Sequence, residues 1–229
     1  NCPLAELIAL EKVACPGHGA CGGQYTANTM ACVAEAIGLS LPNSNMAPAP
    51  YQSREEVARA AGQQVMELLA RNIRPRDICT RAAFENAARV VAATGGSTNA
   101  ALHLPAMASE CGIAFDLFDV ARIFKETPYL ADLKPGGQYV AKDMHDAGGV
   151  YMAMRTLLDG GFLDGNPMTV TGKTLGENIE GARVWNADVI LPRDKPLKKS
   201  GGIVMLRGSL APDGAVIKTL LGRLGAAVA

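Results

Sequence analysis

The chain has 229 residues, of which 48% are hydrophobic, and its 22 lysine and arginine residues balance 22 aspartate and glutamate residues. This hydrophobic fraction excludes an intrinsically disordered chain and is sufficient for one substantial core. The balanced charge excludes a large basic face, so we expect no nucleic acid partner.

Cysteine usage and apolar run lengths indicate the compartment. Six cysteines are too sparse for a disulfide scaffold in a chain of this length, and no secretory signal is recognisable. The longest apolar runs, residues 87–94 and 102–108, are far shorter than the roughly 20 residues that a membrane helix needs. We therefore expect a cytoplasmic protein that does not enter the membrane.

Both ends of the chain are unusual. The sequence starts at Asn1 without an initiator Met, and an apolar helical pattern begins at Leu4. The last ten residues are mostly small and apolar. These features predict that the chain is a piece of a longer protein.

Helical patterns cover most of the first 160 residues. Their apolar spacing predicts helices at about residues 26–39, 54–71, 81–93, 100–111, 117–126 and 146–160. In the second of these, Val57, Ala61, Val65 and Leu68 recur every three or four residues, with Ser53 ahead of them as an N-cap candidate. We expect that stripe to face the core.

The pattern changes near Met168. Short β-branched runs at residues 168–171, 188–191, 203–207 and 215–218 are separated by Gly, Pro and Asp, which predicts strands. We expect an α/β fold with a layered α/β/α domain at residues 1–184. Residues 185–229 are then the first strands of a second, β-barrel-like domain.

Cys21 lies in a glycine-rich turn that leads into the helix beginning near Thr26. A thiol near a helix N-terminus is exposed to the positive end of the helix dipole, which favours the thiolate, and the adjacent glycines allow a bulky group to approach closely. Such a thiolate is a nucleophile or a metal ligand. An ordinary buried cysteine in a tight turn is the alternative.

A second glycine pair, Gly95 and Gly96, separates two predicted helices and is followed by Ser97 and Thr98. Hydroxyls and free N–H groups at a helix start form a favourable place for a small anion. Simple capping of the following helix is the alternative interpretation.

Other candidate motifs are weaker. Residues 170–174 resemble the end of a phosphate-binding loop, but Pro167 stands where its first Gly is required. Cys15, Cys21 and His18 lack the second closely spaced pair that a zinc site needs. His103 on an apolar face is more typical of a core histidine than of a general base, and His145 has polar surroundings that suggest exposure.

Residues 15–30 (CPGHGACGGQYTANTM) and 95–99 (GGSTN), with LHL at 102–104, closely resemble the two signatures of the dihydroxy-acid dehydratases. The resemblance continues through ADLKP at 131–135, MTVTGKT at 168–174 and GSLAPDGA at 208–215. Practically the whole chain is similar to the middle portion of such an enzyme.

The resemblance implies a lyase that removes water from a 2,3-dihydroxy carboxylic acid, giving a 2-keto acid in branched-chain amino acid biosynthesis. It also implies an iron-sulfur cluster, usually 2Fe-2S rather than 4Fe-4S, held by three cysteines beside Mg²⁺, in a homodimer. Cys21 would be the last iron ligand, and Cys15 ranks below it. Thr26, Ser97 and Thr98 become candidates for binding the substrate.

The chain departs from the family pattern in several respects. The other two cluster cysteines and the Mg²⁺ ligands should lie outside this chain, as should the catalytic base, and Gln24 replaces a more usual Met. No catalytic residue is therefore expected within these residues, and we expect the isolated chain to be inactive. A sugar-acid (aldonate) dehydratase of the same superfamily is one alternative function, and a non-catalytic assembly module is another.

Overall fold

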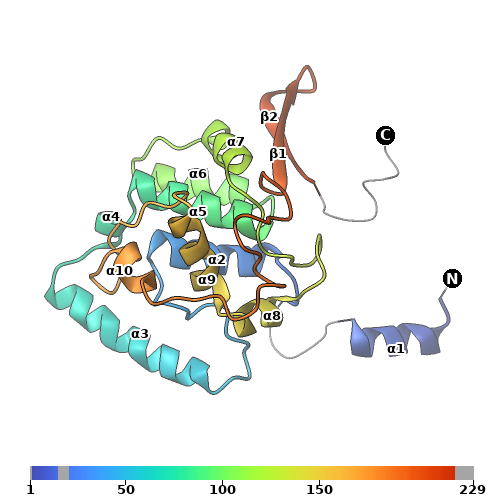
Figure 1. Cartoon of the computed structure of the whole chain (residues 1–229), viewed down its shortest axis with the longest axis horizontal. Coiled ribbons are helices and arrows are strands. Elements are labelled where there is room, and N and C mark those ends of the chain that lie inside the picture. Colours follow the sequence, from blue (N-terminus) through green and yellow to red (C-terminus); the bar gives the residue numbers. More distant parts are fainter. Residues whose placement is uncertain (1, 15–20, 220–229) are drawn as a thin grey trace.

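The computed structural model describes residues 2–14 and 21–219. These residues form ten helices and one two-stranded sheet, a mixed α/β fold in which helices predominate (Figure 1). The helices are α1 (Leu4–Val13), α2 (Thr26–Ile37), α3 (Ser53–Ala70), α4 (Pro75–Ile78), α5 (Arg81–Thr94), α6 (Ala100–Glu110), α7 (Leu117–Glu126), α8 (Ala141–Asp146), α9 (Gly149–Asp159) and α10 (Leu175–Ile179). The strands are β1 (Ile203–Gly208) and β2 (Ala211–Lys218).

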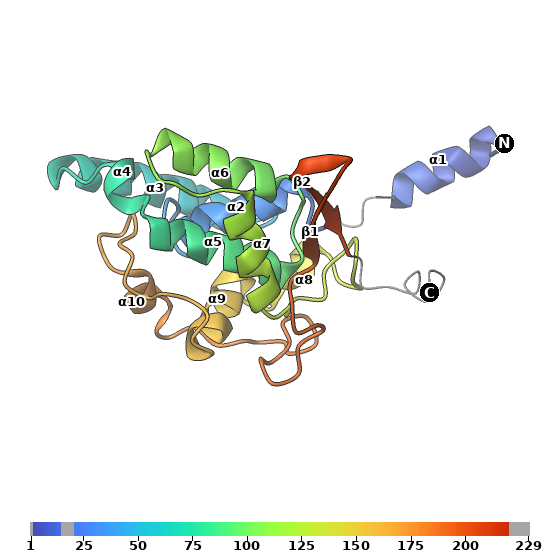
Figure 2. The ribbon, with the colours of Figure 1, turned by 90° about the horizontal axis from the view of Figure 1, so that it is seen from above.

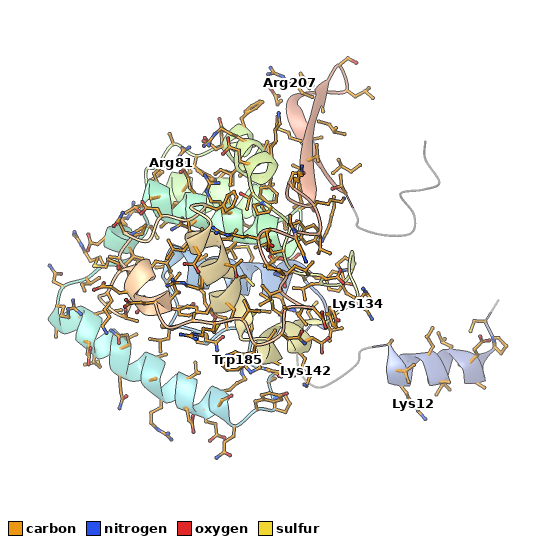
Figure 3. All side chains as sticks on the ribbon, in the orientation of Figure 1. Lys12, Arg81, Lys134, Lys142, Trp185 and Arg207 are labelled. Carbon is orange, nitrogen blue, oxygen red and sulfur yellow. The ribbon has the colours of Figure 1, made fainter. Side chains whose placement is uncertain are left out.

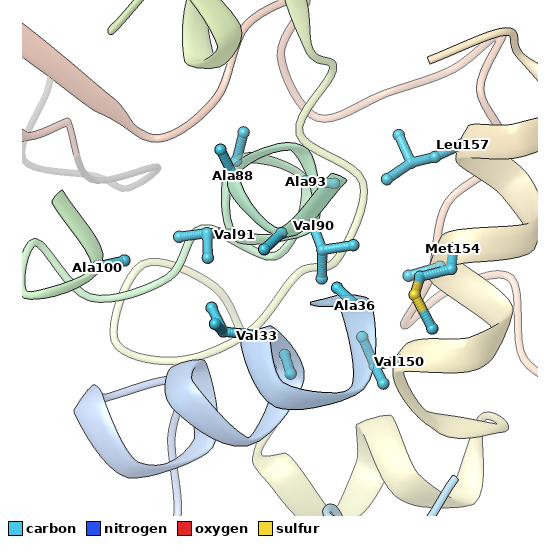
Figure 4. Close-up of a cluster of buried hydrophobic side chains, with 14 of the residues drawn as sticks. Val33, Ala36, Ala88, Val90, Val91, Ala93, Ala100, Val150, Met154 and Leu157 are labelled. Atoms are coloured by element: carbon cyan, nitrogen blue, oxygen red, sulfur yellow. The ribbon is translucent and has the colours of Figure 1, made fainter. Parts of the chain in front are cut away.

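Helix α5 lies at the centre of the core, in contact with α2, α6, α7 and α9. Small side chains allow this close approach, because Val33 and Ala36 of α2 meet Val90 and Val91 of α5 (Figure 4). Val150 from α9 completes this part of the core (Figure 4). Fully burying each such valine contributes roughly 1.5 kcal/mol or more, so the alanine- and valine-rich helices fix one another.

The ends of α2 and α5 follow from local sequence. The Thr80 side chain accepts a hydrogen bond from the backbone N–H of Ala83 and caps the start of α5. Gly38 and Gly95 end α2 and α5 in left-handed conformations, with φ of 94° and 74°. Glycine adopts this conformation at little cost, so the chain turns sharply at both points.

Helix α3 differs from its prediction. None of its residues is buried, and Val65 is 54% exposed. Val57, Ala61 and Val65 instead line a groove of about 220 Å³ between α3 and residues 39–45. The expected burial of this stripe in the core is therefore wrong, since α3 runs along the edge of the body (Figure 1).

Helix α1 lies apart from the body in both views (Figures 1 and 2). It confirms the helical pattern expected at Leu4. Its apolar side chains are exposed, with Leu4 at 72% and Leu10 at 57%. No described residue therefore covers this helix.

Two of the four predicted strands form. β1 and β2 pair antiparallel as a hairpin, with Ile203 opposite Lys218 and a register shift between Leu206 and Gly208. The segments at 168–171 and 188–191 make only isolated bridges, Met168 with Thr174 and Ile190 with Ala131. The described residues thus contain one hairpin, and the layers and the barrel remain predictions.

The predicted helix 146–160 corresponds to α9, which begins three residues later, and the short α8 before it was not predicted. Gly148 and Gly149 adopt φ of 106° and 74°, which is incompatible with a continuous right-handed helix. Helix α8 consequently ends at Asp146, and α9 begins at Gly149.

Charged side chains lie on separate elements of the surface. Arg81, Lys142 and Arg207 project from α5, α8 and β1 (Figure 3). Arg81 pairs with Glu85 and Asp119, and Lys142 pairs with Asp146. Across residues 2–14 and 21–219, we find no helix with the length and apolar character needed to cross a membrane.

Candidate functional site

The N-terminal turns of α2 and α6 meet through polar side chains. The Thr26 hydroxyl oxygen lies 3.2 Å from that of Ser97. The Asn99 side-chain amide donates to the Thr26 hydroxyl at 2.7 Å. The two helix starts that the sequence singled out are therefore brought together.

Backbone contacts fix the turn that carries Ser97. The Ser97 N–H donates to the hydroxyl of Thr29 on α2 at 2.9 Å. A Cβ on Gly95 would lie 2.1 Å from the hydroxyl oxygen of Tyr129, and one on Gly96 would lie 2.3 Å from Val91. Only glycine at both positions allows the turn to pack this closely against Tyr129 and against Val91 of α5.

The capping roles differ from the prediction. Asn99, not Ser97 or Thr98, is the N-cap residue of α6. The Ser97 hydroxyl instead accepts the backbone N–H of Asn99 at 3.2 Å. The Thr98 side chain is half-buried and makes no hydrogen bond within the described parts of the chain. Thr98 is thus adjacent to the hydroxyl pair without joining it.

The loop of Cys21 is held from α2. The Asn28 side-chain amide donates to the carbonyl oxygens of Cys21 and Gly23, at 2.8 Å and 2.7 Å. The Cys21 side chain is half-buried, five residues before α2 begins. Cys15 and His18 lie outside the described residues.

A second loop closes on the first. The N–H of Gln24 donates to the carbonyl of Lys134 at 2.7 Å, while the Lys134 side chain projects to the surface (Figure 3). The N–H of Ala141 donates to the carbonyl of Gly22. Residues 22–24 are therefore bound to the segment 134–141 as well as to α2.

Several other cysteines fit the role of a metal ligand less well than Cys21. Burial raises the pKa of the Cys32 thiol to about 12. Burial, together with the neighbouring Cys111, raises that of Cys79 to about 11. Cys2 is exposed ahead of α1, and Cys111 follows the far end of α6. Within the described residues, Cys21 is the cysteine beside the meeting helix starts.

The donor set can be compared with an iron-sulfur cluster. No group of three or more His, Cys, Asp or Glu side chains in the described segments is placed to hold a metal ion. A thiol in a loop with adjacent glycines fits a single cluster ligand. It does not fit a complete site.

The contacts of three polar residues were not predicted from the sequence. Asn28 holds the Cys21 loop, and an Asn just after a glycine-rich turn was a usable signal. Gln24 is buried, with its amide nitrogen 3.4 Å from the Cys32 sulfur and 3.3 Å from the Thr94 hydroxyl. Lys218, at the end of β2, donates to the carbonyl of Gly96 at 2.6 Å. No local pattern predicted that last contact.

The two weaker histidine candidates lie elsewhere. His103 is half-buried on α6, between the exposed Leu102 and the buried Leu104. His145 is half-buried against Tyr51, with ring centroids 5.7 Å apart, and burial lowers its pKa. The expected exposure of His145 is therefore wrong.

Two known family descriptions match this chain. Residues 2–178 match the family described as Dihydroxy-acid/6-phosphogluconate dehydratase N-terminal. Residues 188–222 match its C-terminal counterpart. The chain belongs to this dehydratase family.

Individual members of the dehydratase family are closely similar. A dihydroxy-acid dehydratase of Parvibaculum lavamentivorans is 64% identical over 215 residues, which cover 93% of this chain and 37% of the relative. Dihydroxy-acid dehydratase 2 of Bradyrhizobium diazoefficiens is 63% identical, with the same coverage. A dihydroxy-acid dehydratase of Pelagibacter ubique is 63% identical over 206 residues. The chain thus spans little more than a third of the length of these relatives.

Proposed function

We propose that this chain forms part of a dihydroxy-acid dehydratase, a hydro-lyase of branched-chain amino acid biosynthesis. The enzyme would remove water from a 2,3-dihydroxy carboxylic acid and release a 2-keto acid. The observation that carries the proposal is the meeting of Thr26 with Ser97 beside the Cys21 loop. Relatives named dihydroxy-acid dehydratase that are more than 60% identical support the substrate class.

The chain's own contribution is to bind and orient the substrate. Thr26, Ser97 and Thr98 would bind oxygen atoms of the dihydroxy acid, with hydroxyls that both donate and accept hydrogen bonds. The first turns of α2 and α6 add the partial positive charge of two helix N-termini, which favours a carboxylate. Gly95 and Gly96 are buried and let the turn that carries Ser97 pack directly against Tyr129 and Val91.

Cys21 would hold iron of a 2Fe-2S cluster, which is preferred over a 4Fe-4S cluster. Its glycine-flanked loop and partial exposure support this role, and its single thiol implies further ligands outside this chain. When bound, such a cluster supplies a Lewis acid for the departing hydroxyl. The Mg²⁺ ligands and the base would also lie outside the chain, so we propose that the chain alone is inactive.

The domain organisation is part of the same proposal. Residues 1–184 would belong to an α/β/α-layered domain, and residues 185–229 would open a β-barrel-like domain. Exposed apolar residues on the hairpin, such as Leu206 at 52% and Leu210, support further strands beside it. The full-length protein would be a cytoplasmic homodimer.

A sugar-acid dehydratase is the second candidate, because the matched family description also includes 6-phosphogluconate dehydratase. The named relatives favour the first candidate. A non-catalytic assembly module is the third, and the exposed hairpin is the feature that fits it.

One chimera separates these functions. We define it as the Parvibaculum lavamentivorans relative with its matching segment replaced by this chain. It should form keto acid from a branched-chain 2,3-dihydroxy acid and turn over aldonates and 6-phosphogluconate at least about tenfold more slowly. Preference for an aldonate would support the second candidate, and a folded, iron-loaded chimera without turnover would contradict both enzymatic proposals.

A further inference from the structure

The end of the β-hairpin reaches the glycine turn of the site. Lys218 is the last residue of β2, and its ammonium donates to the carbonyl of Gly96, the residue before Ser97. The N–H of Thr219 donates to the carbonyl of Gly202 at 2.8 Å, which anchors the end of β2. A segment matched to the C-terminal domain of the family thereby contacts the N-terminal domain.

The Lys218 charge is only partly compensated. The side chain is half-buried, and burial lowers its pKa. Within the described residues, no carboxylate lies within 4.0 Å of its nitrogen, and Gly96 is its one hydrogen-bond acceptor. An ammonium has three N–H donors, so two remain for a ligand.

The neighbouring groups select the class of ligand. The carbonyl that this cation binds belongs to Gly96, and the next residue, Ser97, carries the hydroxyl that lies 3.2 Å from that of Thr26. A small anion would offset the cost of desolvating this ammonium, because a nearby opposite charge favours the charged form. The carboxylate of a hydroxy acid supplies both the anion and adjacent hydroxyls for hydrogen bonding.

We propose that Lys218 binds the carboxylate of the substrate, next to the hydroxyl pair of Thr26 and Ser97. This inference rests on the proposed function. The competing role is purely structural, with Lys218 only tying the hairpin to the Gly96 turn. If Lys218 binds the carboxylate, affinity depends on the charge of the ligand. If Lys218 is only a structural tie, it does not.

The test compares a charged and a neutral ligand in the chimera. Binding of the product 2-keto acid and of its primary amide is measured by calorimetry for Lys218→Met, Lys218→Arg and the unsubstituted chimera. Lys199→Met is the matched control, because Lys199 is exposed on the segment leading to β1. Melting temperatures show whether each variant is folded.

The proposal predicts that Lys218→Met weakens keto acid binding roughly 10- to 100-fold and leaves amide binding almost unchanged. Lys218→Arg should retain much of the preference for the keto acid over its amide. Lys199→Met should retain this preference in full. Equal weakening of both ligands, or no weakening, would overturn the proposal in favour of a structural tie. If Lys218→Met does not fold, Lys218→Arg and Lys218→Gln decide by the same comparison.

Failure of the proposed function would be visible separately. A chimera that binds the keto acid through Lys218 but dehydrates no dihydroxy acid would contradict the function and leave the binding role intact. A chimera that dehydrates the dihydroxy acid normally but binds the keto acid and its amide equally well would contradict the binding role of Lys218 and leave the proposed function intact.

Discussion

The hydroxyl oxygens of Thr26 and Ser97 lie 3.2 Å apart, although 71 residues separate them in the sequence. This contact joins the two motifs that resemble the dehydratase signatures. It is supported from the backbone by Thr29, which accepts the N–H of Ser97. A substitution in either motif should therefore disturb the position of the other.

Replacing Ser97 with alanine tests the binding role of the pair. In the chimera, Ser97→Ala should raise KM for the dihydroxy acid about tenfold, because a hydrogen bond to a charged ligand contributes roughly 1.5 kcal/mol or more. Ser109→Ala, at the exposed far end of α6, is the control and should change KM by less than about twofold. Steady-state kinetics decide the matter, and an unchanged KM for Ser97→Ala would remove Ser97 from the site.

Two glycine-to-alanine substitutions should have opposite effects on stability. Gly95 has φ of 74°, and its Cβ would collide with Tyr129, so Gly95→Ala should destabilise the chain by at least about 2 kcal/mol. Gly62 lies inside helix α3 with no atom within 4 Å of a Cβ. Gly62→Ala should therefore stabilise the chain by about 0.5–1 kcal/mol. Urea unfolding measures both, and a neutral Gly95→Ala would contradict the packing of the glycine turn.

Glu35 should make stability depend on pH. Its carboxyl oxygens accept the N–H groups of Asn43 and Asn45, and burial raises its pKa to about 7 from an ordinary value of 4.5. Between these two values the folded chain holds a proton that the unfolded chain releases. The stabilising contribution of this group is therefore complete below about pH 4.5 and is lost as the pH rises through about 7.

The non-titrating variant Glu35→Gln isolates this effect. Urea unfolding from about pH 5 to about pH 8 should show the wild-type chain losing stability relative to Glu35→Gln, by a few kcal/mol at most. Glu55→Gln, on the exposed first turn of α3, should run parallel to the wild type. Parallel curves for Glu35→Gln as well would show that Glu35 does not titrate in this range.

Local signals predicted much of the helical fold. The predicted helix at 81–93 differs from α5 by one residue, because Thr80 caps its start and Gly95 terminates it. The predicted helix at 117–126 coincides with α7, whose capping box joins Asp116 and Asp119. N-cap residues and the glycines that end helices can be recognised in the sequence. They therefore indicate where these helices begin and end.

Features that depend on distant partners could not be predicted this way. The run at 168–171 has strand-like residues, yet Met168 bridges only Thr174 across a turn that includes Gly172. The stripe on α3 has core-like spacing, but its neighbours leave a groove there. Strand formation and burial require a second surface, and periodicity does not reveal whether one is present.

The site was predictable only in part. Resemblance placed Cys21, Thr26 and Ser97 in signature motifs, but their spacing could not show that Thr26 and Ser97 touch. The contribution of Lys218 comes from a strand end 122 residues after Gly96. Such contacts are consequences of the tertiary fold, and no local pattern encodes them.

The most direct test of the account is the iron content of Cys21→Ser in the chimera. Cys111→Ser is the control, since Cys111 is a half-buried thiol at the opposite end of α6. We predict that Cys21→Ser loses most of its iron, its acid-labile sulfide and its visible cluster absorption, whereas Cys111→Ser retains all three. Full iron and sulfide loading with normal keto acid formation in Cys21→Ser would contradict the account.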